Sequence, residues 1–169
     1  MNKEREYQRI IELLKAVLKD ENDLIANLAN SAAILYNNLS DVNWAGFYLR
    51  RDNELVLGPF QGQNACVRIE KGSGVCGTAW AKKEIQLVPD VHQFPGHIAC
   101  DAASNSEIVV PIIIDSKVRG VLDIDSPSKD RFNSQDSDYL QKVVGIIREE
   151  TIFLLNMEMT LNRFLAAKD

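Results

Sequence analysis

Three cysteines are the most reactive side chains of this 169-residue chain: Cys66, Cys76 and Cys100. In a reducing compartment, an odd set of cysteines serves packing, metal ligation or redox chemistry rather than a disulfide framework. We expect no metal, because His92, His97 and Cys100 share a loop but lack the paired short spacing of zinc ligands. Redox chemistry requires an accessible thiolate and a second thiol within reach. Inert packing stays open for each cysteine.

Three carboxylates and two aromatic residues form a second candidate group. Asp123 and Asp125 alternate with apolar residues on one strand, and Glu107 begins the preceding strand. If the two strands pair in register, the three acids share one face. They then repel one another unless they bind a cation, such as an ammonium group, or hold a proton for acid catalysis. Trp44 and Tyr48 share a face of another strand and could line a pocket. The alternatives are solvated strand ends for the acids and core packing for the aromatics.

Helical and strand patterns alternate around these residues. Apolar residues three and four apart predict helices over 4–18 and from about 24 to 38, the second capped by Asn22 or Asp23. A short helix over 75–82, after a Gly-Ser-Gly turn, would carry Cys76. Asn133 or Ser134 caps a final helix from about 134 to 165. The other segments have a period of two and predict strands: one from Val42, then 54–60, 65–69, 85–88, and a hairpin of 108–114 and 118–124.

A long loop over 89–106 has no clear period and contains Cys100. Loops of this length inside a compact domain tend to be functional. The pattern as a whole predicts an α+β fold with a mostly antiparallel sheet. The length fits a single domain over 1–169, with its core at about 22–150.

Composition narrows the classes of function. The chain has 19 Lys and Arg against 24 Asp and Glu, a net charge of -5, and no long basic cluster. This balance disfavours a nucleic-acid binder, whose affinity comes largely from basic residues on phosphates. No apolar run approaches the roughly 18 residues of a membrane span. The N-terminus is charged where a secretory signal would be apolar. We therefore expect a cytoplasmic protein that binds neither nucleic acid nor membranes.

Five segments together resemble the GAF-domain family of free methionine-(R)-sulfoxide reductases. The segments are NWAGFYL (43–49), LGPFQGQNACVRI (57–69), GSGVCGTAW (72–80), DVHQFPGHIACDAASNSEIVVP (90–111) and GVLDIDSP (120–127). The resemblance covers about residues 10–150, and the FPGHIACD loop with all three cysteines is its most specific part. It implies a six-stranded antiparallel sheet with helices on its back and a small pocket on its front. It also implies reduction of free methionine (R)-sulfoxide to methionine, without a cofactor.

The resemblance assigns a role to each candidate residue. Cys100 matches the nucleophile, Cys66 the resolving thiol, and Cys76 a further cysteine that assists recycling. The other matches are an aromatic wall around the substrate methyl group and an acidic cluster around its polar ends: Trp44 and Tyr48, and Glu107, Asp123 and Asp125.

The implied reaction explains these residue types. The Cys100 thiolate attacks the sulfoxide sulfur while an acid protonates the oxygen, which releases methionine and leaves a sulfenic acid. Cys66 then forms a disulfide with Cys100, and thioredoxin reduces it. We also expect a homodimer. The alternative is a GAF module that senses a small ligand or the redox state of its thiols without turnover.

Overall fold

The computed structural model describes residues 3–96 and 103–166, with side chains up to residue 151. A six-stranded antiparallel sheet forms its centre, in the strand order β3–β2–β1–β6–β5–β4. The strands are β1 (Trp44–Arg51), β2 (Glu54–Gly62), β3 (Arg68–Glu70), β4 (Gln86–Val88), β5 (Ser106–Ile114) and β6 (Lys117–Ser126). The predicted α+β fold and the predicted β5–β6 hairpin are confirmed.

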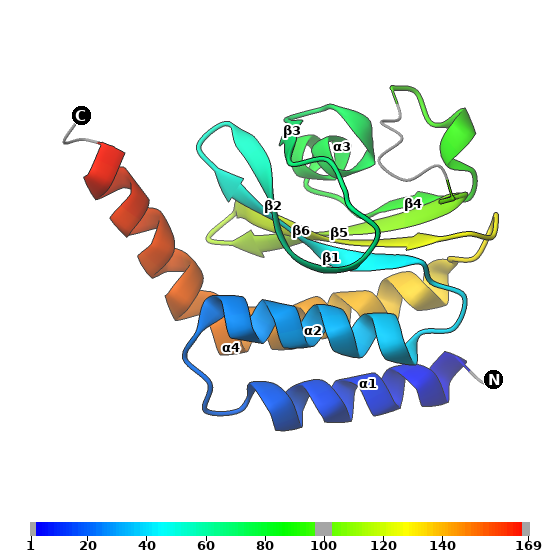
Figure 1. Cartoon of the computed structure of the whole chain (residues 1–169), viewed down its shortest axis with the longest axis horizontal. Helices are drawn as coiled ribbons and strands as arrows, with labels where there is room; N and C mark the ends of the chain where they lie inside the picture. The colour runs from blue at the N-terminus through cyan, green and yellow to red at the C-terminus, as the bar shows by residue number, and fades with distance from the viewer. Residues whose placement is uncertain (1–2, 97–102, 167–169) are drawn as a thin grey trace.

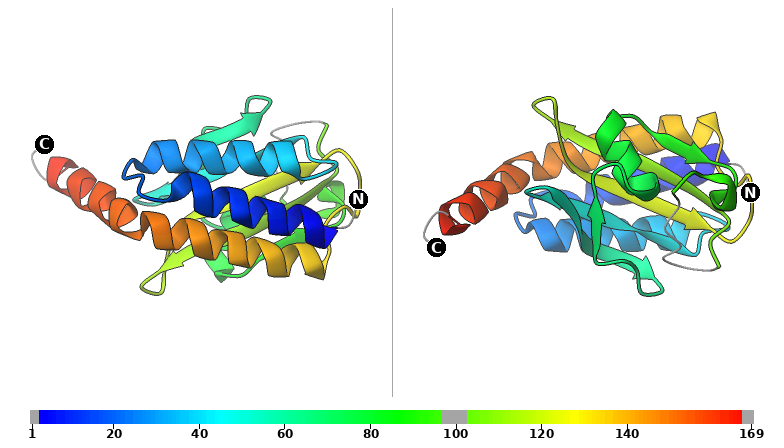
Figure 2. Two further views of the ribbon diagram at one scale, coloured as in Figure 1. Left: turned by 90° about the horizontal axis from the view of Figure 1, so that it is seen from below. Right: turned by 90° about the horizontal axis from the view of Figure 1, so that it is seen from above.

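Three helices cover one face of the sheet, which we call the back face. They are α1 (Lys3–Leu18), α2 (Leu24–Asn38) and the first part of α4 (Ser134–Ala166), which lie side by side (Figures 1 and 2). Their apolar stripes pack against alternate strand residues in the main core, which includes Leu14, Leu28, Phe47, Ile124 and Leu140. Beyond the edge of the sheet, α4 continues away from the rest of the molecule (Figure 1).

The opposite face, which we call the front face, carries the shorter elements. Helix α3 (Gly74–Lys82) and the 3-10 helix η1 (Val91–Gln93) lie here, over a smaller apolar cluster that includes Trp44, Tyr48 and Val109. Alternate side chains of β1 therefore point to opposite faces of the sheet, as predicted: Trp44 and Tyr48 lie on the front face and Phe47 on the back face. A thin layer above a rigid sheet leaves room for a pocket.

Polar caps fix the starts of two helices on the back face. The Asp23 carboxylate accepts the backbone N–H of Ala26 at 2.8 Å, so Asp23 caps α2. The Asn133 side chain accepts the N–H of Gln135 at 2.9 Å and caps α4 in the same way. For each helix, one of the two caps predicted from the sequence is therefore the observed cap: Asp23 for α2 and Asn133 for α4.

The strand predicted over 65–69 is present as β3, but its predicted start is wrong, because β3 begins three residues later. Before β3, the carbonyl of Val67 still accepts the backbone N–H of Leu57 on β2 at 2.9 Å, but the carbonyls of Gln63 and Cys66 accept side-chain donors instead. The Trp44 indole N–H donates to the carbonyl of Gln63 at 3.0 Å, and the Tyr48 hydroxyl donates to that of Cys66 at 3.0 Å. Cys66 therefore lies in an irregular segment held by the aromatic residues of the front face.

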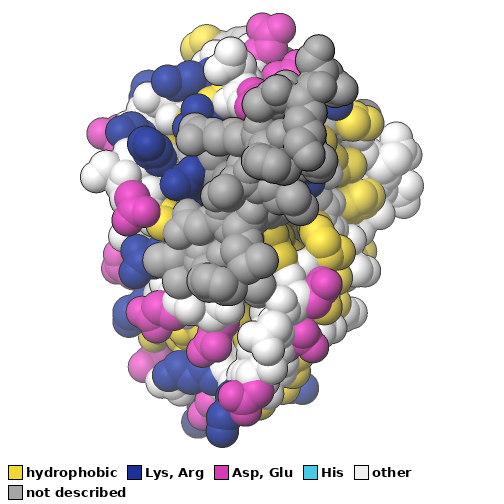
Figure 3. Space-filling view, turned by 90° about the vertical axis from the view of Figure 1, so that its left-hand side faces the viewer, with side chains coloured by type: hydrophobic (Ala, Val, Ile, Leu, Met, Phe, Trp, Pro, Cys, Tyr) yellow, Lys and Arg dark blue, Asp and Glu magenta, His cyan; other side chains and the backbone are white. Residues whose placement is uncertain are grey.

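Basic and acidic side chains are intermixed around the end of the molecule shown in Figure 3. This arrangement fits a chain with a modest net charge of -5. Among the described residues, no helix combines the length and the apolar character that crossing a membrane requires.

Candidate active site

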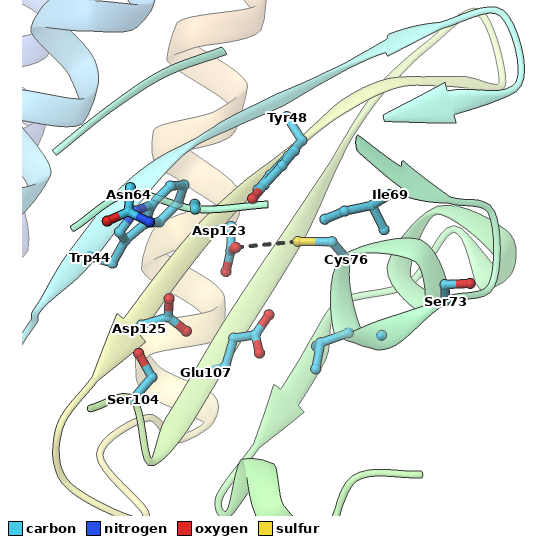
Figure 4. Close-up of a pocket in the computed structure, with 13 residues that line it drawn as sticks. Trp44, Tyr48, Asn64, Ile69, Ser73, Cys76, Ser104, Glu107, Asp123 and Asp125 are labelled. Atoms are coloured by element: carbon cyan, nitrogen blue, oxygen red, sulfur yellow. Dashed lines mark hydrogen bonds between the residues drawn. The ribbon is translucent and has the colours of Figure 1, made fainter. Parts of the chain in front are cut away.

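A pocket of about 40 Å³ opens on the front face, between β1, β5, β6 and the start of α3 (Figure 4). Six of the eight site residues predicted from the sequence line it: Trp44, Tyr48, Cys76, Glu107, Asp123 and Asp125. Cys66 lies beside this lining, immediately after Ala65. Cys100 and the neighbouring His97 lie outside the described residues.

The hairpin register brings the three carboxylates together. Glu107 on β5 pairs directly with Asp125 on β6, and Asp123 pairs with Val109 one step along the same face. Glu107 and Asp123 are each only 7% exposed. None of the described residues that line the pocket is basic, so no lining side chain neutralises this charge. We call Glu107, Asp123 and Asp125 the acidic cluster.

Burial keeps a proton in the acidic cluster. It raises the pKa of Glu107 well above its usual value, and the charges of Asp123 and Asp125 raise it further. Burial also raises the pKa of Asp123 to about 6, although hydrogen bonds from Cys76 and Glu107 favour its charged form. Glu107 is therefore the member of the cluster that stays protonated, beside the more acidic Asp123. A carboxyl group that stays protonated near neutral pH can act as a general acid.

Cys76 joins the acidic cluster from the first turn of α3. Its thiol donates a hydrogen bond to Oδ2 of Asp123 at 3.3 Å (Figure 4). Burial raises the pKa of this thiol well above its ordinary value, and the charge of Asp123 adds to the effect. The chain can place α3 this close to β3 because residue 77 is glycine, where a Cβ would lie 2.3 Å from the carbonyl oxygen of Glu70.

Trp44 and Tyr48 form an aromatic wall beside the acids, on the neighbouring strand β1, where Trp44 pairs directly with Asp125. Their ring centroids are 6.1 Å apart, and Trp44 also stacks on Phe60 at 5.3 Å. Between them, Gly46 leaves the space for this stacking, because a Cβ there would lie 2.3 Å from that of Phe60. Burial raises the pKa of Tyr48, with Asp123 adding to the effect, so it stays a neutral donor. The wall thus brings two aromatic rings to the pocket, and its polar atoms donate to the carbonyls of Gln63 and Cys66.

The cysteines differ in their bonding. Cys66 is disulfide-bonded, whereas Cys76 is a free thiol. Cys66 also accepts the Tyr48 hydroxyl through its backbone carbonyl, which ties it to the aromatic wall. The disulfide-bonded cysteine therefore lies at the edge of the pocket, and the thiol inside the pocket is hydrogen-bonded to an acid instead.

The sequence prediction missed several pocket residues, notably Asn64, Ser104 and the segment 73–75. The Gly-Ser-Gly turn was a usable signal for the last of these, because it placed a helix start beside Cys76. His92, considered from the sequence as a metal ligand, is exposed on η1, where its Nδ1 lies 3.0 Å from the Asp90 carboxylate. Neither His92 nor Asp90 is among the lining residues.

Known proteins resemble this chain over most of its length. A family described as GAF domain matches residues 19–148. Protein YtsP of Bacillus subtilis is 58% identical over 82% of this chain and 86% of its own. Free methionine-R-sulfoxide reductase of Escherichia coli is 53% identical over 86% and 88%. The structure of free methionine-R-sulfoxide reductase from Neisseria meningitidis in complex with its substrate matches with a TM-score of 0.86 and 44% identity, covering 89% of this chain and 90% of that one.

Proposed function

Because the chain belongs to the GAF-domain family of free methionine-R-sulfoxide reductases, we propose that it reduces free L-methionine (R)-sulfoxide to L-methionine. One observation carries this proposal: a largely buried acidic cluster, with no basic residue among the described residues of the pocket lining, lies beside the aromatic wall of Trp44 and Tyr48. A free amino acid supplies the missing cation through its ammonium group. Its S-methyl group suits the apolar ring faces.

The acidic cluster has two duties in this proposal. Glu107 donates its proton to the sulfoxide oxygen, because burial and its acidic neighbours keep it protonated. Asp123 and Asp125 then hold the ammonium group with their negative charge. A peptide-bound methionine sulfoxide has an amide nitrogen in place of the ammonium group, so it would leave these charges unmatched.

Cys100 is the proposed nucleophile, and Cys66 is the proposed resolving thiol. Oxygen transfer reduces the sulfoxide sulfur to a thioether and oxidises Cys100 to a sulfenic acid. The Cys66 thiol then displaces water from the sulfenic acid and forms a disulfide. Cys66 is disulfide-bonded while Cys76 is free, which supports these roles. Ser104 lines the pocket and follows Cys100 by four residues, a length of chain that spans at most about 14 Å.

A dithiol must reset the enzyme after each turnover, and thioredoxin is the proposed reductant. A cytoplasmic location suits this cycle, because thiols are kept reduced there. Cys76 assists through its hydrogen bond to Asp123, and any thiol exchange by it belongs to recycling. We also propose a homodimer formed through the terminal helices, of which α4 extends beyond the sheet.

Turnover of resolved sulfoxides tests the activity. With dithiothreitol as reductant, we expect methionine from the free R epimer, and little from the free S epimer or from N-acetylmethionine sulfoxide. Equal reduction of the N-acetylated compound would contradict recognition of the ammonium group. Binding of the free sulfoxide without methionine formation would favour a sensor instead.

Single-turnover reactions test the cysteine roles. Cys100→Ser should form no methionine, whereas Cys66→Ser should form about one equivalent and then stop because its sulfenic acid is not resolved. Equal yields from the wild type and Cys100→Ser would overturn the assignment.

A further inference from the structure

The free thiol of Cys76 lies against two buried carboxylates, and the proposed reduction uses it for no bond to the substrate. We propose that Cys76, Glu107 and Asp123 form a binding site for a soft divalent metal ion such as Zn²⁺ or Cd²⁺. This site goes beyond the proposed function and does not depend on it.

The geometry of the three donor atoms fits such an ion. One sulfur and two carboxylate oxygens all lie within 4.8 Å of one another. The thiol sulfur of Cys76 is 3.3 Å from Oδ2 of Asp123. Zinc bonds of about 2.0–2.3 Å place neighbouring ligand atoms roughly 3.3–3.8 Å apart in a tetrahedron. The sulfur and Oδ2 are therefore already at ligand spacing, on α3 and β6, and Glu107 needs only a small side-chain movement on β5.

A separate feature of Asp123 also points to a ligand. Its Oδ1 atom is buried and has no hydrogen-bond partner among the described residues. The residue is 7% exposed and faces the pocket (Figure 4). A buried carboxylate oxygen without a partner is unfavourable, and a bound cation removes that cost. Asp125 lines the same pocket and can add a fourth oxygen, directly or through water.

The donor types select the kind of metal. A thiolate favours zinc and cadmium, whereas magnesium and calcium prefer sites built only from oxygen atoms. Coordination displaces the thiol proton, so Cys76 binds as the thiolate. The sequence prediction of no metal rested on the lack of paired, closely spaced zinc ligands in the 89–106 loop. These three ligands are instead 31 and 16 residues apart in the chain and meet only through the fold.

Cadmium titration of the full-length double variant Cys66→Ser/Cys100→Ser tests the site, because Cys76 is then the sole cysteine. We expect an ultraviolet thiolate-to-cadmium absorption band that saturates at one equivalent. Adding Cys76→Ser should remove the band. A Cys76-only protein without the band would overturn the proposal, and so would a band that persists after Cys76→Ser. Neither variant has the proposed nucleophile, so these results are independent of turnover.

Two further substitutions in the Cys76-only protein test the carboxylates. Asp123→Asn should weaken cadmium binding at least ten-fold, whereas Asp115→Asn, in the exposed turn of the same hairpin, should leave it unchanged. Equal affinities of these two variants would overturn the assignment of Asp123. Displacement of cadmium by a moderate excess of Mg²⁺ would overturn the choice of a soft metal.

A spectrum of the Cys76-only protein needs no further variant. If Asp123→Asn does not fold, ¹¹³Cd NMR should still give a resonance typical of one sulfur with oxygen ligands. A resonance typical of two or more sulfurs would contradict the site.

Discussion

Two buried acidic groups lie on opposite faces of the sheet and differ in their partners. On the back face, Asp136 is fully buried and contacts the cations of Lys3 and Arg131, the Tyr7 hydroxyl and the backbone N–H of Asn133. We call this group the Asp136 cluster. On the front face, none of the described residues that line the pocket of the acidic cluster is basic.

The two clusters shift the pKa of their buried aspartate in opposite directions. Burial raises the pKa of Asp136, but the hydrogen bonds from Lys3, Asn133, Tyr7 and Arg131 outweigh it and hold that pKa below its usual value. Burial raises the pKa of Asp123 to about 6 in the pocket. A buried aspartate is thus a structural link where the chain itself supplies cations. Where the described lining residues supply no cation, as in the pocket, a buried aspartate suits the ligand site proposed above.

The largest expected effect is on stability at the back face. Asp136→Asn should lower the free energy of unfolding by about 3–5 kcal/mol, because it leaves the nearly buried Arg131 without its counter-charge. Urea denaturation at pH 7 measures this loss. Turnover per folded molecule should stay unchanged, since Asp136 lies behind the sheet. A loss below about 1 kcal/mol would place Asp136 among ordinary surface ion pairs.

Asp123→Asn should have the opposite pattern: activity should fall, and stability should not. We expect kcat/KM for the free sulfoxide to fall about 100-fold, or about 2.7 kcal/mol, because the ammonium group loses a buried charge. Stability at pH 8 should be equal to or higher than that of the wild type, because a buried charge is removed. Steady-state assays and urea denaturation of the same preparation test both parts. Similar losses of stability in both variants would remove the distinction between the two clusters.

The pH dependence of stability should separate the clusters further. The pKa of Asp123 is about 6 in the folded protein and about 3.9 in an unfolded chain. Its contribution is therefore fully present below about pH 4 and declines as the pH rises to 6, by up to about 3 kcal/mol. Asp136 has a lowered pKa, so its contribution is lost as the pH falls.

Denaturation curves from pH 3 to 8 test these signs. Asp123→Asn should flatten the decline above pH 4, and Asp136→Asn should flatten only the acid side. The same change of slope in both variants would contradict the comparison.

The smallest expected effect comes from a single hydroxyl of the Asp136 cluster. Tyr7→Phe removes one 2.9 Å hydrogen bond and keeps the ring stacked on Tyr139. The other partners of Asp136 remain, so the loss should be about 1 kcal/mol. Thermal and urea denaturation measure it. A loss as large as that of Asp136→Asn would mean that the hydroxyl, and not the charge, holds the cluster together.

The acidic cluster could be predicted from the sequence, but the Asp136 cluster could not. Alternation along a hairpin determines that Asp123 and Asp125 share a face, and local pairing then brings in Glu107. By contrast, Lys3 and Asp136 are 133 residues apart and meet only because α1 packs beside α4. In the sequence, Asp136 resembles any acid in the first turn of a helix.

The error at 65–69 has a related cause. Val67 and Ile69 have the alternation of a strand, but the hydrophobic pattern carries no information on side chains from other strands that donate hydrogen bonds to the backbone carbonyls. Trp44 and Tyr48 donate to the carbonyls of Gln63 and Cys66, where a regular strand would use backbone donors. The role of Cys100 stays a prediction, because it lies outside the described residues.

The aromatic wall also makes the pocket optically accessible. The chain has two tryptophans, and only Trp44 lines the pocket, whereas Trp80 is buried beneath Arg50 and Lys71. Trp80→Phe would leave a single fluorophore stacked on Phe60 at the binding surface. Its emission would then report the arrival and departure of any occupant in real time, without a label and without turnover.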